Sequence, residues 1–161
     1  MPAGATYEPI ATTTLGSATT TVTFSSISGS YTDLFIVVDI PTATVNNNLQ
    51  IRYNSDTGSN YSFTQLQDAS SNRASNATSL QTGALYSSAR TTNIYQIQNY
   101  SNTTTYKTQL CRFGNPDFTV GTNVGLWRNT NAITSIEFKV AGGTDNYPSG
   151  TTFTLYGIKA A

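Results

Sequence analysis

The last thirty residues of the chain hold the pattern that most restricts its fold. Ile133–Val140 and Thr151–Ile158 both place apolar side chains at every second position, which is the period of a β-strand. The segment between them, Gly142–Gly150, is rich in turn-forming residues. The pattern predicts two strands joined by a loop. Because the sequence stops shortly after the second strand, we expect its last residues to complete a sheet rather than form a tail.

The same two-residue period recurs along the whole sequence, and no stretch has the sustained 3.6-residue period of an amphipathic helix. About ten strands, separated by turn signals, predict one all-β domain, an antiparallel β-sandwich or barrel. Asp33–Ile40 is continuously apolar, which favours a central position in such a sandwich. We expect the sandwich over residues 15–161 and an N-terminal arm or edge strand over residues 1–14. The other expected strands are Pro9–Leu15, Thr21–Ile27, Asn48–Asn54, Tyr61–Leu66, Ser79–Tyr86, Thr92–Tyr100, Tyr106–Phe113 and Asn123–Asn129. We expect Thr92–Tyr100 to pair with Tyr106–Phe113 as a hairpin.

Two segments are predicted to be contact loops. Gln67–Ala77 has no apolar periodicity and is rich in Ser and Asn, so it is the longest loop expected. Gly114–Thr122 contains turn formers and is the second. Loops at the surface of a rigid scaffold often carry binding residues, so both segments are candidates for contact with a partner.

The chain is poor in charge. Only 10% of its 161 residues are charged and the formal net charge is zero, so no cluster of cations favours nucleic-acid binding. No apolar run approaches the length of a membrane span, and the N-terminal residues lack the pattern of a secretion signal, so we expect synthesis in a cytoplasm. A neutral surface rich in Thr, Ser and Asn suits close packing against copies of the same chain or a large assembly.

Residues that commonly carry catalysis are scarce. The sequence has no histidine, which removes imidazole-based triads and most zinc sites, and we expect no cofactor. Cys111 is the single cysteine and lies in a predicted strand, so we expect a buried structural thiol. Asp56-Thr57-Gly58 matches the triplet of aspartic proteases, but the polar residues before it favour a turn.

Two binding chemistries stay open at this stage. A calcium site could use carboxylates from separate loops, although each Asp could simply cap a turn. Aromatic side chains could form a platform for sugar, but packing in the core or a hydroxyl at the rim of the sheet is the favoured explanation. The carboxylates considered are Asp56, Asp117 and Asp145, and the aromatic residues are Trp127, Tyr147 and Tyr156.

Four segments resemble a family of small virion proteins from tailed bacteriophages. Leu49–Ser62 resembles the family's hRFNxDxGxNYxx stretch, and Gly150–Lys159 is similar to its GSxFxLYGIK ending. Asn99–Thr108 and Trp127–Ile136 also resemble it, in the same order along the chain. The family includes capsid decoration or cement proteins and tail-fibre domains. The resemblance implies a jelly-roll-like sandwich, often a trimer, and no catalytic residues.

The resemblance and composition together predict a phage virion structural protein on the capsid exterior. It would cement contacts between subunits of the major capsid protein, and we expect a homotrimer that is not an enzyme and binds neither nucleic acid nor membrane. The alternative is a tail-fibre or receptor-binding domain that recognises host glycan. A depolymerase would need paired carboxylates, which the sequence does not cluster. The candidate interaction surface is Thr12, Thr13, Thr14, Asn72, Arg73, Asn76, Asn115, Asp117 and Tyr147.

Overall fold

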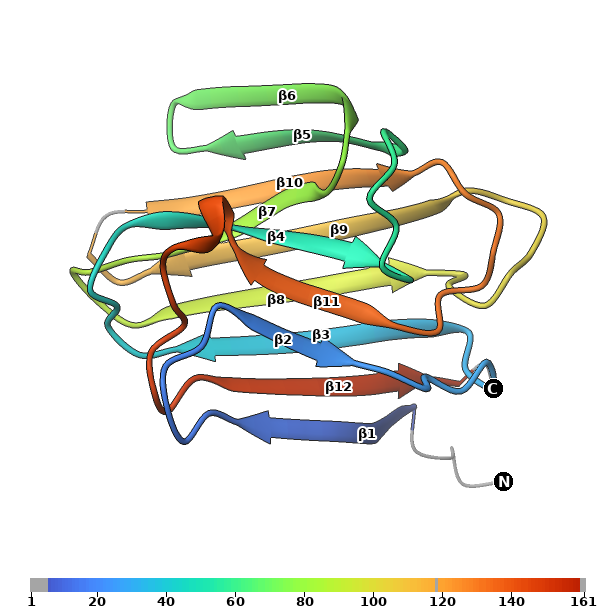
Figure 1. The fold of residues 1–161 in the computed structure, drawn as a ribbon, viewed down its shortest axis with the longest axis horizontal. Helices are drawn as coiled ribbons and strands as arrows, with labels where there is room; N and C mark the ends of the chain where they lie inside the picture. The colour runs from blue at the N-terminus through green and yellow to red at the C-terminus, as the bar shows by residue number, and fades with distance from the viewer. Residues whose placement is uncertain (1–5, 118, 160–161) are drawn as a thin grey trace.

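A computed structural model of the chain describes residues 6–117 and 119–159. The described residues form two antiparallel β-sheets that face each other, and 58% of these residues lie in strands (Figure 1). This confirms the predicted all-β, jelly-roll-like sandwich. A single 3-10 turn, Ala141–Gly143, interrupts the β structure of the described part. Within this part, no helix has the length and apolar character needed to cross a membrane.

The strands are assigned to the two sheets in an order that crosses repeatedly between them. The larger sheet has the order β1-β12-β3-β8-β9-β10-β5-β6, and the smaller has the order β2-β11-β4-β7. The strands are β1 (Tyr7–Thr14), β2 (Thr21–Phe24), β3 (Asp33–Ile40), β4 (Asn47–Tyr53), β5 (Tyr61–Gln67), β6 (Ser70–Ala77), β7 (Leu80–Leu85), β8 (Thr91–Gln98), β9 (Lys107–Asn115), β10 (Thr119–Trp127), β11 (Ile136–Val140) and β12 (Thr152–Ile158).

The core lies between the sheets because alternate side chains of each strand point there. In β3, Leu34, Ile36, Val38 and Ile40 are fully buried, while the residues between them are only half-buried. The continuous apolar run therefore marks a central strand, hydrogen-bonded to β12 and β8, as the sequence predicted. The predicted pairing of β8 with β9 is also confirmed.

The larger sheet is twice as wide as the smaller, so part of it has no sheet opposite. The β5–β6 hairpin extends past the smaller sheet at one side of the molecule (Figure 1). β6 is mostly exposed on both faces, because little core lies beneath it.

Two predicted loops are wrong. Most of the expected Gln67–Ala77 loop is the strand β6, which pairs with β5. Most of Gly114–Thr122 belongs to the ends of β9 and β10, leaving only a short turn. Backbone hydrogen bonds can hold a strand whose side chains are all polar. An edge strand that has no core beneath it therefore does not need an apolar residue at every second position. The polar sequence of β6 therefore did not predict a strand.

Of the predicted N-terminal arm or edge strand, Tyr7–Thr14 forms the edge strand β1, paired with β12. Residues 1–5 lie outside the described residues. At the other end of the same sheet, β6 is the second edge.

Three buried amide side chains of the larger sheet hold β7 across the interior. Asn93 pairs with the backbone of Ala84, accepting from its N–H and donating to its carbonyl, both at 3.0 Å. Gln109 donates to Thr82 Oγ1 at 2.9 Å, and Asn123 donates to the carbonyl of Gln81 at 2.7 Å. These bonds satisfy polar groups that would otherwise be buried without partners.

The backbone of β7 is shaped to receive Asn93. Gly83 has a φ of +67°, a conformation that favours glycine. A Cβ atom at Gly83 would lie 2.2 Å from Asn93 Oδ1, so a side chain there would displace the amide.

The turn after β4 is organised by the Asp56 carboxylate. Its oxygens accept hydrogen bonds from the backbone N–H of Gly58 at 2.8 Å, Asn60 Nδ2 at 2.9 Å and Trp127 Nε1 at 2.7 Å. Burial alone would raise the pKa of Asp56, but the hydrogen bonds from Trp127, Asn60 and Gly58 outweigh it and lower the pKa. The Asp-Thr-Gly triplet is thus the predicted turn, and its carboxylate also anchors a buried tryptophan from β10.

Replacing Asn93 with alanine should destabilise the sandwich. The change leaves a buried N–H and a buried carbonyl of Ala84 without partners, so we expect a loss of about 2–4 kcal/mol in the free energy of unfolding. Chemical denaturation measures it. Gln96→Ala, on the outward side of the same strand, is the control and should cost less than about 1 kcal/mol. Equal losses in the two variants would contradict the role given to Asn93.

The Asp56 carboxylate should make stability depend on pH in acid. Because folding lowers its pKa, its contribution is present above the unfolded pKa, about 4, and is lost as pH falls through the folded pKa. Asp56→Asn should therefore be less stable than the parent at pH 7, and the difference should shrink below about pH 4. Thermal unfolding from pH 7 to pH 2 tests this. A difference that stays constant over this range would rule out the carboxylate as its source.

Candidate functional site

The two outward faces of the sandwich differ in chemistry. The outward positions of the smaller sheet carry polar side chains, among them an ion pair between Arg52 and Glu137 at 3.6 Å. Such a face is well solvated and gives no sign of a partner. The remaining outward residues there include Thr21, Thr23, Gln50, Gln81 and Lys139.

The outward face of the larger sheet instead carries apolar side chains on every strand except β6, interspersed with Thr, Gln and the exposed Arg112, and we call it the open face. On β10, Val120 and Val124 are 70% and 55% exposed, and on β5 Leu66 is 53% exposed. The strand register places these side chains beside outward residues of β9 and β8. The apolar residues of the open face are Tyr7, Phe35, Val37, Leu66, Ile94, Leu110, Val120, Val124, Leu126 and Tyr156.

An aromatic group forms one end of this apolar face. Tyr7 of β1 packs edge-on against Phe35 of β3, with ring centroids 5.4 Å apart, and Tyr156 of β12 lies 6.5 Å from both rings. The rings cover one another only in part, since Tyr7 is half exposed. The open face therefore presents aromatic rings over β1, β12 and β3, and aliphatic side chains over β8, β9, β10 and β5.

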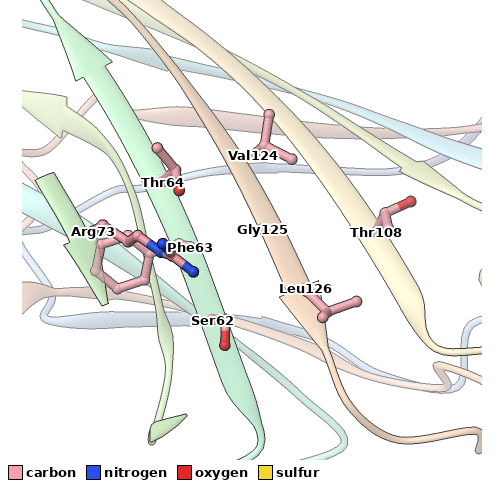
Figure 2. A pocket seen from close by; sticks show the side chains of 8 residues that line it. All are labelled: Ser62, Phe63, Thr64, Arg73, Thr108, Val124, Gly125 and Leu126. Carbon is pink, nitrogen blue, oxygen red and sulfur yellow. The ribbon is translucent and has the colours of Figure 1, made fainter. Parts of the chain in front are cut away.

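A shallow hollow of about 290 Å³ lies in the aliphatic part of the open face. Figure 2 shows Thr64 and Arg73 on one side of it and Val124, Leu126 and Thr108 on the other. Gly125 on β10 lines the hollow with its backbone, because a side chain at this position would point inward toward Leu80. Its lining has no acid or base pair, so the hollow is suited to receive an apolar side chain of a partner rather than to perform catalysis.

The size of the open face is that of a protein interface. Its eight strands are seven to nine residues long. With strands about 4.8 Å apart and about 3.3 Å per residue, the face covers roughly 900 Å². A stable protein interface buries about 800 Å² on each partner.

The predicted interaction residues of β1 lie along one edge of this sheet. Thr12 and Thr14 are exposed and point toward the open face, and Thr14 Oγ1 is 3.3 Å from Thr152 Oγ1. Thr13 points toward the interior and is half-buried. The unpaired backbone side of β1 faces outward, since β12 occupies the other side.

Three other predicted residues lie on β6, at the opposite edge. Asn72 and Arg73 are exposed, and Arg73 lines the hollow of the open face. Asn76 has a structural task, because its Oδ1 accepts a hydrogen bond at 2.9 Å from Arg128, which also binds the carbonyl of Ser59 at 2.7 Å. The structure therefore separates the β1 and β6 groups by the width of the sheet.

The predicted residues Asn115 and Asp117 belong to the turn between β9 and β10. Asn115 Oδ1 accepts from the backbone N–H groups of Asp117 at 3.2 Å and Thr119 at 3.3 Å, so it shapes the turn. Asp117 is exposed. The nearby Asp68 ties this turn to the β5–β6 turn by accepting from Thr119 Oγ1 at 2.9 Å.

The prediction of Tyr147 as a surface residue is wrong. Tyr147 is fully buried and packs edge-on against Phe153, with ring centroids 5.1 Å apart. Trp127 is also buried, so these two residues cannot form a sugar platform, while Tyr156 lies on the open face. Tyr147 is flanked by turn formers in the sequence, but the bridge between Thr19 and Tyr147 draws it into the core.

Nucleophilic and metal-binding chemistry finds no support among the described residues. Cys111 is buried as predicted, and burial raises the pKa of its thiol to about 12, so it is protonated and unreactive at neutral pH. Asp56 and Asp145 lie near opposite ends of β4, where Asp145 accepts from Asn47 at 2.6 Å. No three metal-ligating side chains come together within residues 6–117 and 119–159.

The sequence analysis missed the open face because β10 inverts the usual alternation. Between Thr119 and Trp127 at its two ends, which are buried, the inward positions are Gly121, Asn123 and Gly125, while the outward positions are Val120, Thr122, Val124 and Leu126. Small residues are needed inside because β7 comes close: a Cβ atom on Gly125 would lie 2.7 Å from Leu80 Cδ1. The signal was present in Thr119–Trp127, where apolar and small polar residues alternate, but the alternation does not say which set faces the core.

Comparisons with known proteins assign no family to the chain. No family profile matches the chain, and no curated protein matches it significantly. Among solved structures, the alginate lyase Aly36B matches with a TM-score of 0.43 and 10% identity, covering 91% of this chain and 77% of the other. The galectin LEC-6 of Caenorhabditis elegans matches with a TM-score of 0.39 and 8% identity, covering 89% of this chain and 94% of the other.

Proposed function

We propose that the chain is a structural protein of a bacteriophage virion that decorates the outside of the head and cements neighbouring subunits of the major capsid protein. The proposal combines the resemblance of four sequence segments with one observation of the structure. That observation is the contrast between a polar outer face on one sheet and a wide apolar outer face on the other. An uncovered apolar face of this size is typical of a surface that a partner covers.

The open face is the surface we assign to the capsid shell. It is broad, and its apolar side chains are aromatic, β-branched or Leu, so little rotamer entropy is lost when they are ordered at an interface. A protein that binds only the assembled shell stabilises that shell by mass action. Cementing therefore requires no chemistry beyond a complementary surface, in agreement with the inert thiol of Cys111.

The homotrimer belongs to the same proposal. Three-fold and quasi-three-fold positions of a shell are natural sites for a trimer of decorating subunits. The exposed backbone edge of β1 offers hydrogen-bonding groups to a neighbouring copy. Light scattering of the purified chain should give three times the mass of one chain, and a monomer at micromolar concentration would contradict this part of the proposal.

Replacing Val124 with lysine should weaken binding to heads that lack the protein. The change places a charge in the middle of the open face, where docking would remove it from water, so we expect a loss of about tenfold or more in affinity. Thr23→Lys, an exposed position on the smaller sheet, is the matched control and should bind like the parent. Co-sedimentation with heads measures binding, and thermal unfolding verifies that both variants fold.

Two results would overturn the assignment. The first is parental binding by Val124→Lys, which would exclude the open face as the contact. The second comes from mass spectrometry of separated heads and tails: the protein should be associated with heads in numbers that match symmetric shell sites. A few copies confined to tails would instead favour the tail-fibre alternative.

A further inference from the structure

A second surface feature lies on the other side of the β5–β6 hairpin, away from the open face. Two polar hollows border the hairpin there. One, of about 230 Å³, is lined by residues of the hairpin itself, among them Gln65, Gln67 and Asn72. The other, of about 300 Å³, is lined by Gln67 together with Asn48 and Tyr86. Gln67 lines both hollows, and we call the two hollows together the amide groove. The full lining is Gln65, Gln67, Asp68, Ser70, Ser71 and Asn72 on one side, and Asn46, Asn47, Asn48, Ala84 and Tyr86 on the other.

A hydrogen-bonded chain orders the floor of the amide groove. Gln65 Nε2 donates to Gln67 Oε1 at 3.0 Å, and Gln67 Nε2 donates to the hydroxyl of Tyr86 at 2.9 Å. Both amide orientations are therefore set by their neighbours. Polar groups held in this way are preorganised for a ligand, because they lose little freedom when it binds.

One acceptor in this floor has no partner among the described residues. Gln65 is 4% exposed, yet its Oε1 receives no hydrogen bond there. A buried acceptor without a donor costs free energy, so such groups in folded proteins normally meet a ligand or an ordered water. Gln65 lines the first hollow, so a small movement of its side chain would bring this buried acceptor within reach of a donor from a bound molecule.

Two further amide side chains lie on the walls of the groove. No hydrogen bond is recorded for the side chains of Asn72 on β6 and Asn48 on β4 within the described part of the chain. Each amide carries both a donor and an acceptor. The lining includes no Lys or Arg, and its one carboxylate, Asp68, is already bound to Thr119 and to the backbone of Val120.

From this chemistry we infer that the amide groove binds a neutral saccharide chain. Hydroxyl groups of a sugar both donate and accept, as the amides of the groove do, whereas a phosphate or sulfate would need cations that the groove lacks. A peptide would also need apolar anchors, which the polar walls do not provide. Two hollows that share Gln67 in their lining fit successive sugar units of a chain better than a single sugar. The inference is independent of the proposed docking through the open face.

The test is a titration of the ¹⁵N-labelled full chain, followed by NMR of backbone and side-chain amides. The probes are the neutral hexasaccharides maltohexaose, cellohexaose and mannohexaose, the corresponding monosaccharides, and an acidic galacturonate oligomer. We expect at least one neutral hexasaccharide to shift the side-chain NH₂ signals of Gln65, Gln67 and Asn72, and to bind more tightly than its monosaccharide. Absence of shifts with every neutral probe, tighter binding of the acidic oligomer, or equal affinity for hexasaccharide and monosaccharide would each overturn the inference.

Two variants test the walls of the groove without disturbing the fold. Asn72→Ala and Asn48→Ala each remove an amide for which no side-chain hydrogen bond is recorded, and each should weaken hexasaccharide binding about threefold to tenfold. Asn131→Ala, an exposed amide in the loop after β10, is the matched control and should bind like the parent. Unchanged binding in both wall variants would contradict the site. Head binding by the same variants is measured in parallel, so failure of the saccharide site and failure of the docking proposal give different results.

Discussion

The Asp56 carboxylate holds together the end of the sandwich where three distant segments meet. It binds Trp127 of β10 and the turn after β4, and the same turn is fixed to the loop after β10 by Asn54, which donates to Ala132 at 2.8 Å. Lys107 adds a third tie. Its buried ammonium donates to the carbonyls of Thr105 and Thr130, and burial lowers its pKa. Three of the four segments on which the proposed resemblance rests contribute to this end of the sandwich, namely Leu49–Ser62, Asn99–Thr108 and Trp127–Ile136.

The rigid scaffold fixes the positions of the side chains on both surfaces of the sandwich. Amide side chains inside the sandwich fix β7 to the larger sheet, and the small inward residues of β10 let the two sheets approach closely. With these small residues inside, Val120, Val124 and Leu126 of β10 point outward. The apolar open face and the tight packing beneath it are thus two results of one alternation, which links the interior of the molecule to the surface proposed to bind a shell.

Much of the fold could be predicted from the sequence, because strands with core beneath them alternate in a recognisable way. The β8–β9 hairpin, the central position of β3, the Asp56 turn and the buried thiol of Cys111 were all predicted and are confirmed. The polar strand β6 was not, since nothing in its composition separates an edge strand from a loop. The burial of Tyr147 and the apolar residues of the open face were also not predicted, for a related reason. Alternation shows that two faces exist, but which of them is covered depends on contacts between residues far apart in the chain.

The ionisable side chains of the protein determine how its charge responds to pH. It has no histidine, and the pKa of its one thiol is raised to about 12. No side chain with an ordinary pKa near neutrality is therefore left to change its charge between about pH 5 and 8. The side chains on the surface proposed to bind a shell would therefore keep the same charge over this range of pH.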